Sequence, residues 1–152
     1  MKHFIAVLLC ALVASALARP EVNQDAVKES GRRIKEAHDK CQTDPATAID
    51  EEALKNARKS GAPPAPPANS GPHSLCISKA VGWQNEDGSI NKANIEEKAH
   101  AIFGEQSDIK NILDECVVAQ ENPEATAVHL FDCYRKHAPH PAGGPHPPPP
   151  HH

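Results

Sequence analysis

The cysteines are the residues of this chain whose type and number most clearly indicate a chemical role. Four of its five cysteines, Cys41, Cys76, Cys116 and Cys133, lie beyond the first eighteen residues. In an oxidising compartment such an even number predicts two disulfides, and three pairings are open. A zinc site is disfavoured, because the sequence contains no Cys-x-x-Cys pair and no closely spaced cysteine–histidine knuckle. These cysteines are therefore interpreted as structural.

Histidine is the second candidate for chemistry, because it recurs in a histidine- and proline-rich tail over 137–152. Its composition predicts disorder. Neutral imidazoles bind copper and zinc, so the tail is a candidate metal site, although the prolines keep its ligands apart. The histidines concerned are His137, His140, His146, His151 and His152. A solubilising tail without metal is favoured, and no cofactor is expected.

Catalytic groups are not expected. Two local pairs stand out: Ser107 next to Asp108, and His129 three residues before Asp132. Neither pair brings a third group that would complete a set of nucleophile, base and orienting residue. They are interpreted as capping and surface residues, and the chain is predicted not to be an enzyme.

The amino-terminal segment 1–18 has the pattern of a secretory signal peptide: a basic start, an apolar run over 4–13 and small residues up to Ala18. The apolar run is much shorter than the roughly 20 residues that span a bilayer. We therefore expect cleavage after Ala18, secretion into an extracellular fluid and no membrane insertion. The net charge of −4 and the lack of a long basic patch argue against nucleic-acid binding.

The positions of the cysteines depend on helices, because apolar residues recur at helical spacing between residues 22 and 136. Helices are predicted over 22–42, over 50–59, around Leu75 and ending near Gly82, over 91–104, from a cap at Ser107 through Val117, and from a cap at Asn122 through Tyr134. A proline-rich connector is expected over 61–72. The fold class is thus all-α: a compact bundle of about six helices around an apolar cavity, forming one domain over 19–136.

From the third helix onward the sequence resembles the insect odorant-binding protein family. The resemblance lies in the run 76–91, in Asn122-Pro-Glu-Ala-Thr-Ala127 and in Cys133-Tyr-Arg-Lys-His137, and it extends over about 22–138. The four cysteines align with the first, third, fourth and sixth of the family's six. Pro72 and Glu124 occupy the second and fifth positions, which is the pattern of the four-cysteine "minus-C" subclass.

The resemblance implies the pairs Cys41–Cys76 and Cys116–Cys133. It also implies a carrier of small hydrophobic ligands, such as odorants or pheromones, with a chemosensory receptor as a partner and a monomeric or weakly dimeric state. The apolar helix faces supply the candidate pocket, which is made of Leu54, Leu75, Ile95, Ile102, Phe103, Ile109, Ile112, Leu113, Val117, Val128, Phe131 and Tyr134. The alternative is a secreted interaction or metal-binding protein that acts through its proline-rich and histidine-rich segments.

Overall fold

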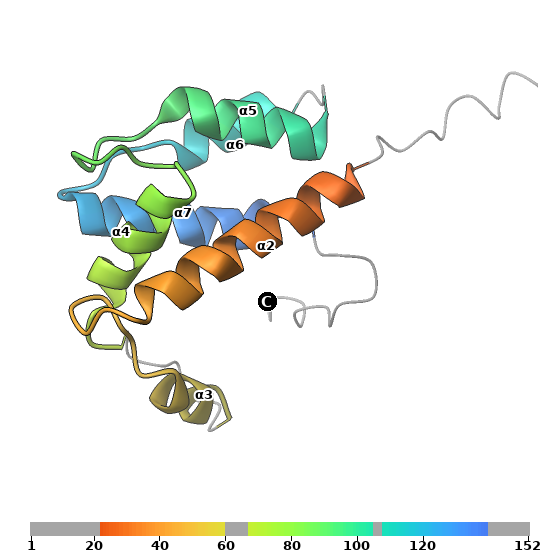
Figure 1. Cartoon of the computed structure of the whole chain (residues 1–152). Coiled ribbons are helices and arrows are strands. Elements are labelled where there is room, and N and C mark those ends of the chain that lie inside the picture. Colours follow the sequence, from red (N-terminus) through yellow and green to blue (C-terminus); the bar gives the residue numbers. More distant parts are fainter. Residues whose placement is uncertain (1–21, 60–66, 105–107, 140–152) are drawn as a thin grey trace, which may run out of the picture.

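The structure, a computed structural model, describes residues 22–59, 67–104 and 108–139. Within these ranges it contains helices and no strand, which confirms the all-α prediction (Figure 1). The helices, labelled as in Figure 1, are α2 (Gln24–Cys41), α3 (Glu51–Lys59), α4 (Ser70–Ala80), α5 (Lys92–Phe103), α6 (Ile109–Cys116) and α7 (Pro123–His137). The predicted signal peptide and the tail from His140 onward lie outside the described residues.

Asparagine starts three of these helices. The side-chain oxygens of Asn23, Asn91 and Asn122 accept hydrogen bonds from backbone N–H groups of the first turn that have no partner within the helix. The predicted start of α7 at Asn122 is thereby confirmed. Gly104 ends α5 with a φ of 67°, a value that residues with a Cβ rarely adopt.

The predicted connector over 61–72 is too long at its carboxyl end, because α4 already begins at Ser70. Pro72 lies in the first turn of that helix. Backbone N–H groups in a first turn have no intrahelical acceptor, so a proline costs no hydrogen bond there. The expected cap Ser107 lies outside the described residues, and Asp108 stands at the start of α6 without a capping side-chain bond.

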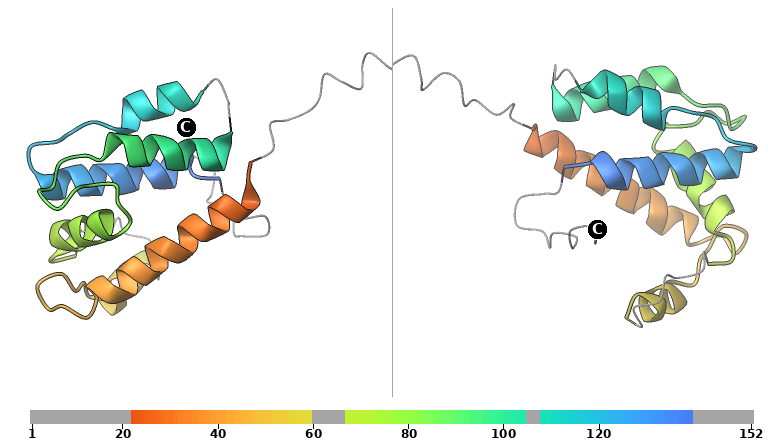
Figure 2. Two further views of the ribbon diagram at one scale, coloured as in Figure 1. Left: turned by 45° about the horizontal axis from the view of Figure 1, so that its top comes forward. Right: turned by 180° about the vertical axis from the view of Figure 1, so that it is seen from behind.

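Helices α4 and α7 make the most extensive contact among the helices of the described residues. Helix α2 packs against α4 and α5, while α6 packs against α5 and α7, so that α5 and α6 form a pair on one side of the bundle (Figures 1 and 2). Among the helices that the structure describes, α3 has no extensive packing partner, and its first residue, Glu51, contacts His38 of α2 at 3.2 Å. The bundle is therefore built from five helices, and α3 extends from it.

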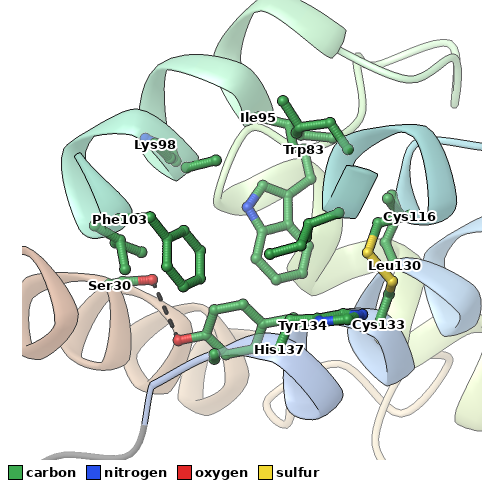
Figure 3. Close-up of a pocket in the computed structure, with 15 residues that line it drawn as sticks. Ser30, Trp83, Ile95, Lys98, Phe103, Cys116, Leu130, Cys133, Tyr134 and His137 are labelled. Carbon is green, nitrogen blue, oxygen red and sulfur yellow. Dashed lines mark hydrogen bonds between the residues drawn. A yellow bond between two sulfur atoms is a disulfide. The ribbon is translucent and has the colours of Figure 1, made fainter. Parts of the chain in front are cut away.

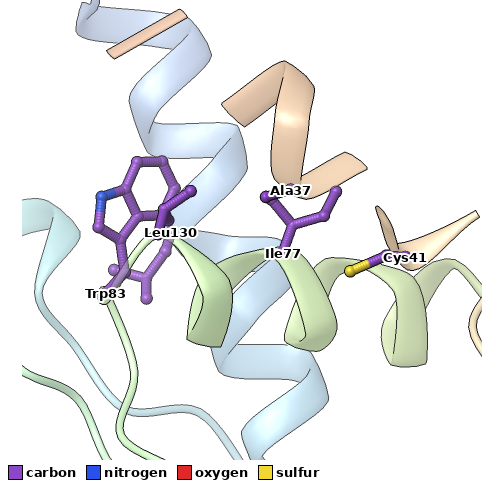
Figure 4. Close-up of a cluster of buried hydrophobic side chains, with 6 residues drawn as sticks. Ala37, Cys41, Ile77, Trp83 and Leu130 are labelled. Carbon is purple, nitrogen blue, oxygen red and sulfur yellow. The ribbon is translucent and has the colours of Figure 1, made fainter. Parts of the chain in front are cut away.

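The core lies where α2, α4 and α7 meet (Figure 4). Trp83, which follows α4, lies against two rings of α7, at centroid distances of 4.7 Å from Phe131 and 5.4 Å from Tyr134. The buried cluster consists of Ala37, Cys41, Ile77, Val81, Trp83 and Leu130. Burying a side chain such as valine, leucine or isoleucine contributes about 1.5–3 kcal/mol, so this cluster is a main source of stability.

Two disulfides link the helices. Cys41–Cys76 joins α2 to α4 across 35 residues, and Cys116–Cys133 joins α6 to α7 across 17. Both predicted pairs are confirmed. None of the described helices has the length and apolar character needed to cross a membrane.

Candidate ligand-binding site

A cavity of about 90 Å³ lies between α5, α6 and α7 (Figure 3). We call it the α5–α7 cavity. Most of its wall is carbon, because the lining side chains are mainly aliphatic and aromatic. The lining residues are Ser30, Trp83, Ile95, Lys98, Ala99, Ile102, Phe103, Ile112, Leu113, Cys116, Leu130, Cys133, Tyr134, His137 and Ala138.

Half of the residues proposed from the sequence as pocket residues line this cavity. They are Ile95, Ile102, Phe103, Ile112, Leu113 and Tyr134. They come from three helices whose apolar faces converge, as helical spacing requires when two or more neighbours pack on a common interior.

The remaining proposed pocket residues have other positions. The side chain of Leu54 lies outside the described residues. Phe131 packs beside Trp83 in the core, and Ile109 is buried at 3% exposure without lining the cavity. Leu75, Val117 and Val128 are partly buried and also lie outside its wall. Periodicity identifies an apolar face, but α7 divides that face between α4 and α6, and this division depends on tertiary packing.

Sequence reasoning missed nine lining residues, in two groups. Ala99, Cys116, Leu130 and Cys133 are apolar residues at helical spacing from the proposed pocket residues, so the spacing could have identified them. Ser30, Trp83, Lys98, His137 and Ala138 come from polar positions or from segments outside the helix faces, and no pattern in the sequence indicates them.

The cavity contains one pair of hydroxyl groups. Ser30 Oγ and Tyr134 Oη are 3.5 Å apart, whereas ordinary O–H···O hydrogen bonds measure about 2.7–2.8 Å (Figure 3). The bond is therefore weak, and both hydroxyls retain capacity to bond an oxygen of a guest molecule.

Charged groups hold the carboxyl end of α7 against α6. Glu115 bonds Lys136, and its second oxygen is 3.1 Å from His137 Nε2. The Lys136 ammonium, with a smaller contribution from His137, lowers the pKa of the Glu115 carboxyl below its usual range. This contact lies beside the Cys116–Cys133 disulfide, so the α6–α7 side of the cavity is fixed both covalently and by charge.

One group of potential metal ligands occurs within the described residues. The ligand atoms of Cys116, Cys133 and His137 lie within 4.8 Å of one another. Zinc binds cysteine as the thiolate, but these two sulfurs are joined in a disulfide. The group is therefore not a metal site in the oxidised protein. The other tail histidines, His140, His146, His151 and His152, lie outside the described residues.

The local pairs considered for catalysis are not joined in a catalytic arrangement. The His129 ring contacts the backbone carbonyl of Glu115 at 3.3 Å, while Asp132 pairs with Arg135. Ser107 lies outside the described residues. His129 and Asp132 thus have separate partners.

A second hollow of about 230 Å³ lies between α2 and α5, and we call it the α2–α5 groove. Its floor is apolar and its edge carries charged side chains. The residues that line it are Ala26, Glu29, Ser30, Arg33, Ile34, Val81, Trp83, Glu97, Lys98, Ala101 and Ile102. Four residues, Ser30, Trp83, Lys98 and Ile102, line both hollows. The two hollows therefore share a wall.

The structure is that of a small helical domain crosslinked by two disulfides, with an apolar hollow of the kind in which proteins bind small molecules. The PBP/GOBP family model matches residues 23–137, and the chain belongs to this family. Proteins of the family are binding and carrier proteins.

The similar curated proteins include two from Tenebrio molitor, the B1 protein and the B2 protein. Each is 26% identical over 116 residues, which is 76% of this chain and 86% of the B1 protein or 88% of the B2 protein. No solved structure matches the chain significantly. The family match ends at His137, so most of the histidine-rich tail lies beyond it.

Proposed function

We propose that this protein is a secreted carrier that binds small hydrophobic molecules in the α5–α7 cavity. The observation that carries the proposal is the apolar wall of that cavity, in which Ser30 and Tyr134 contribute one pair of hydroxyl groups. An apolar molecule gains about 25 cal/mol for each Å² of surface that it removes from water, and one oxygen on it can bond a hydroxyl. Binding of this kind needs no catalytic group and no cofactor.

The size of the cavity limits its guests. An apolar protein cavity of about 150 Å³ holds a benzene molecule, and typical ligand sites enclose about 300–1,000 Å³. At about 90 Å³ the α5–α7 cavity fits only a very small guest in its present form. Larger guests require side chains of the wall to move. The nearest additional space is the α2–α5 groove, which lies behind the wall that the two hollows share.

A fluorescent apolar probe and a series of lipophilic competitors test the carrier function. We expect saturable probe binding that competitors reverse. Ala99→Leu places three extra carbons in the wall of the cavity and should weaken probe binding at least about tenfold. Ala93→Leu makes the same change at an exposed position of α5 outside both hollows and should leave binding unchanged. Absence of saturable binding, or equal binding by both variants, contradicts the proposed site.

Secretion is tested separately. The segment 1–18 supports export, and we expect the exported protein to begin at Arg19. Sequencing the amino terminus of protein released by expressing cells measures this directly. Retention of residues 1–18 in the released protein would contradict cleavage at Ala18.

A further inference from the structure

We propose that the carrier prefers ligands with a carboxylate, and that Lys98 binds this head group where the two hollows meet. The inference rests on the proposed carrier function and specifies its class of ligand: a straight-chain acid with an apolar tail. The tail occupies the α5–α7 cavity, and the head lies at the wall shared with the α2–α5 groove.

The shared wall combines polar and apolar groups. Trp83 and Ile102 contribute apolar surface, whereas Ser30 and Lys98 contribute a hydroxyl and an ammonium group. Figure 3 shows Lys98 on α5, above the cavity, and Ser30 on α2 on the opposite side, with its hydroxyl directed at Tyr134. A molecule with one charged end and one apolar end matches this combination.

Lys98 is partly buried and, within the described residues, makes no hydrogen bond or ion pair. The nearby acid Glu29 does not compensate its charge, because Glu29 already bonds Arg32 and Arg33, each at 2.7 Å. Its ammonium keeps contact with solvent and has no carboxylate partner among the described residues. A ligand carboxylate supplies such a partner through a charge-assisted hydrogen bond.

The other charges of the groove do not favour a cationic ligand. Glu97, the acid next to Lys98 in sequence, is exposed to solvent and lines only the groove. Arg33 is held by Glu29. Lys98 is therefore the charged group that both hollows share, and its side chain has four rotatable carbon–carbon bonds with which to reach a head group at their junction.

The shared wall also accounts for the space that a longer ligand needs. The lysine stem is the most flexible part of this wall, whereas Trp83 is packed against Phe131 and Tyr134. When Lys98 turns toward a carboxylate, its stem leaves part of the boundary between a hollow of about 90 Å³ and one of about 230 Å³. The same movement of the Lys98 side chain would therefore bind the head group and open the boundary between the two hollows.

The test compares octanoic acid, octanol and methyl octanoate as competitors of the fluorescent probe at about pH 8, where the acid is ionised and lysine is protonated. These compounds share one alkyl chain and differ in the head group. We expect the acid to bind about tenfold more tightly than the alcohol and the ester, as expected for one hydrogen bond between charged groups.

Lys98→Met replaces the charged side chain with an uncharged one of similar length, so it should abolish the preference for the acid over octanol, with both affinities measured on the same variant. Lys98→Arg should retain most of the preference. Lys92→Met removes an equal charge at the exposed start of the same helix, where Lys92 pairs with Glu96, and should keep the full preference. Circular dichroism and urea unfolding of each variant separate a folding defect from a binding defect.

Each remaining outcome is decisive. Equal affinity of the original protein for acid and alcohol overturns the role of Lys98 but leaves the carrier function in place. A preference for the acid that survives in Lys98→Met also overturns it. Failure of all three compounds and of the probe to bind overturns both the carrier function and this inference.

Discussion

The two ends of α7 lie in different surroundings, although one apolar stripe runs along the whole helix. At the amino end, Thr126 and Ala127 are buried at 3% and 0% exposure. There α7 approaches α4 so closely that a Cβ added to Gly71 would lie 3.2 Å from the Cβ of Glu124. At the carboxyl end, Tyr134 and His137 line the α5–α7 cavity and remain partly exposed.

The difference shows how side-chain size decides between a solid core and a hollow. Glycine and alanine let α4 and α7 come close at the amino end. At the carboxyl end, large side chains such as Phe103 and Tyr134 line the space between the helices, and no side chain of the described residues fills it. We expect mutations at the packed end to change stability and mutations at the hollow end to change binding.

The largest expected effect comes from the disulfides. Replacing Cys41 and Cys76 by serine releases a loop of 35 residues and should lower the free energy of unfolding by about 4 kcal/mol. Replacing Cys116 and Cys133 releases 17 residues and should cost about 3 kcal/mol. Urea unfolding measures both costs. Because Cys116 and Cys133 line the cavity, only their replacement should also weaken probe binding, measured in conditions where the variant stays folded. If the replacement of Cys41 and Cys76 weakened probe binding instead, the two ends of α7 would not differ in function.

The second largest effect on stability should come from truncating one isoleucine in the packed core and, for comparison, one at the cavity. Ile77→Ala in the packed core should cost about 3 kcal/mol, because the buried site cannot collapse onto the space that the side chain leaves. Ile112→Ala at the cavity should cost about 1 kcal/mol, because Ile112 already faces a hollow. Ile112→Ala should also admit bulkier competitors in the probe assay. Equal costs for the two variants would show that the ends do not differ in packing.

A new disulfide between α4 and α7 should strengthen the packed end of α7. Cysteines in place of Gly71 and Glu124 would have their Cβ atoms about 3.2 Å apart, slightly closer than the roughly 3.5–4.5 Å that separates the Cβ atoms of natural disulfides, so a small shift of α4 against α7 would allow the bond. We expect the oxidised double variant to gain about 1–2 kcal/mol over its reduced form in urea unfolding. Probe affinity should not change, since the crosslink lies at the end of α7 away from the cavity. A changed affinity would show that the two ends are coupled.

The smallest effect concerns pH. His73 on α4 is buried at 5% exposure, and its Nδ1 lies 2.8 Å from the carbonyl oxygen of Thr47, while within the described structure its Nε2 has no hydrogen-bond partner. Burial lowers the pKa of His73 below its ordinary value of 6.5. Below about pH 6.5 the unfolded chain therefore binds a proton that the folded chain excludes, and stability falls as the pH decreases.

Substitution of this histidine tests the sign of that effect. His73→Gln should show a smaller loss of unfolding free energy between about pH 7 and pH 5 than the original protein, whatever its stability at neutral pH. Urea unfolding at several pH values measures the slope. If the variant retains the full slope, other groups are responsible for the loss.

Much of the fold follows from local rules. The cap at Asn122 and the helical spacing of the apolar residues were sufficient to predict the helices and most of their limits. The start of α4 was placed too late, because Pro72 signals a connector unless its position in a first turn is known. The two disulfide pairs followed from the resemblance to a family, since cysteine spacing alone leaves three pairings open.

The sequence by itself determined which residues are apolar and where most helices begin and end, because these properties depend on neighbours within a few positions of the chain. The spacing of the four cysteines along the chain was also sufficient to show which family the sequence resembles. Only the tertiary structure decided where the hollow lies. Phe131 and Tyr134 are three residues apart on one helix, yet Phe131 packs beside Trp83 outside the cavity wall and Tyr134 forms part of that wall. Ser30 and Lys98 reach the same wall from different helices, and such convergence arises only when distant segments pack together.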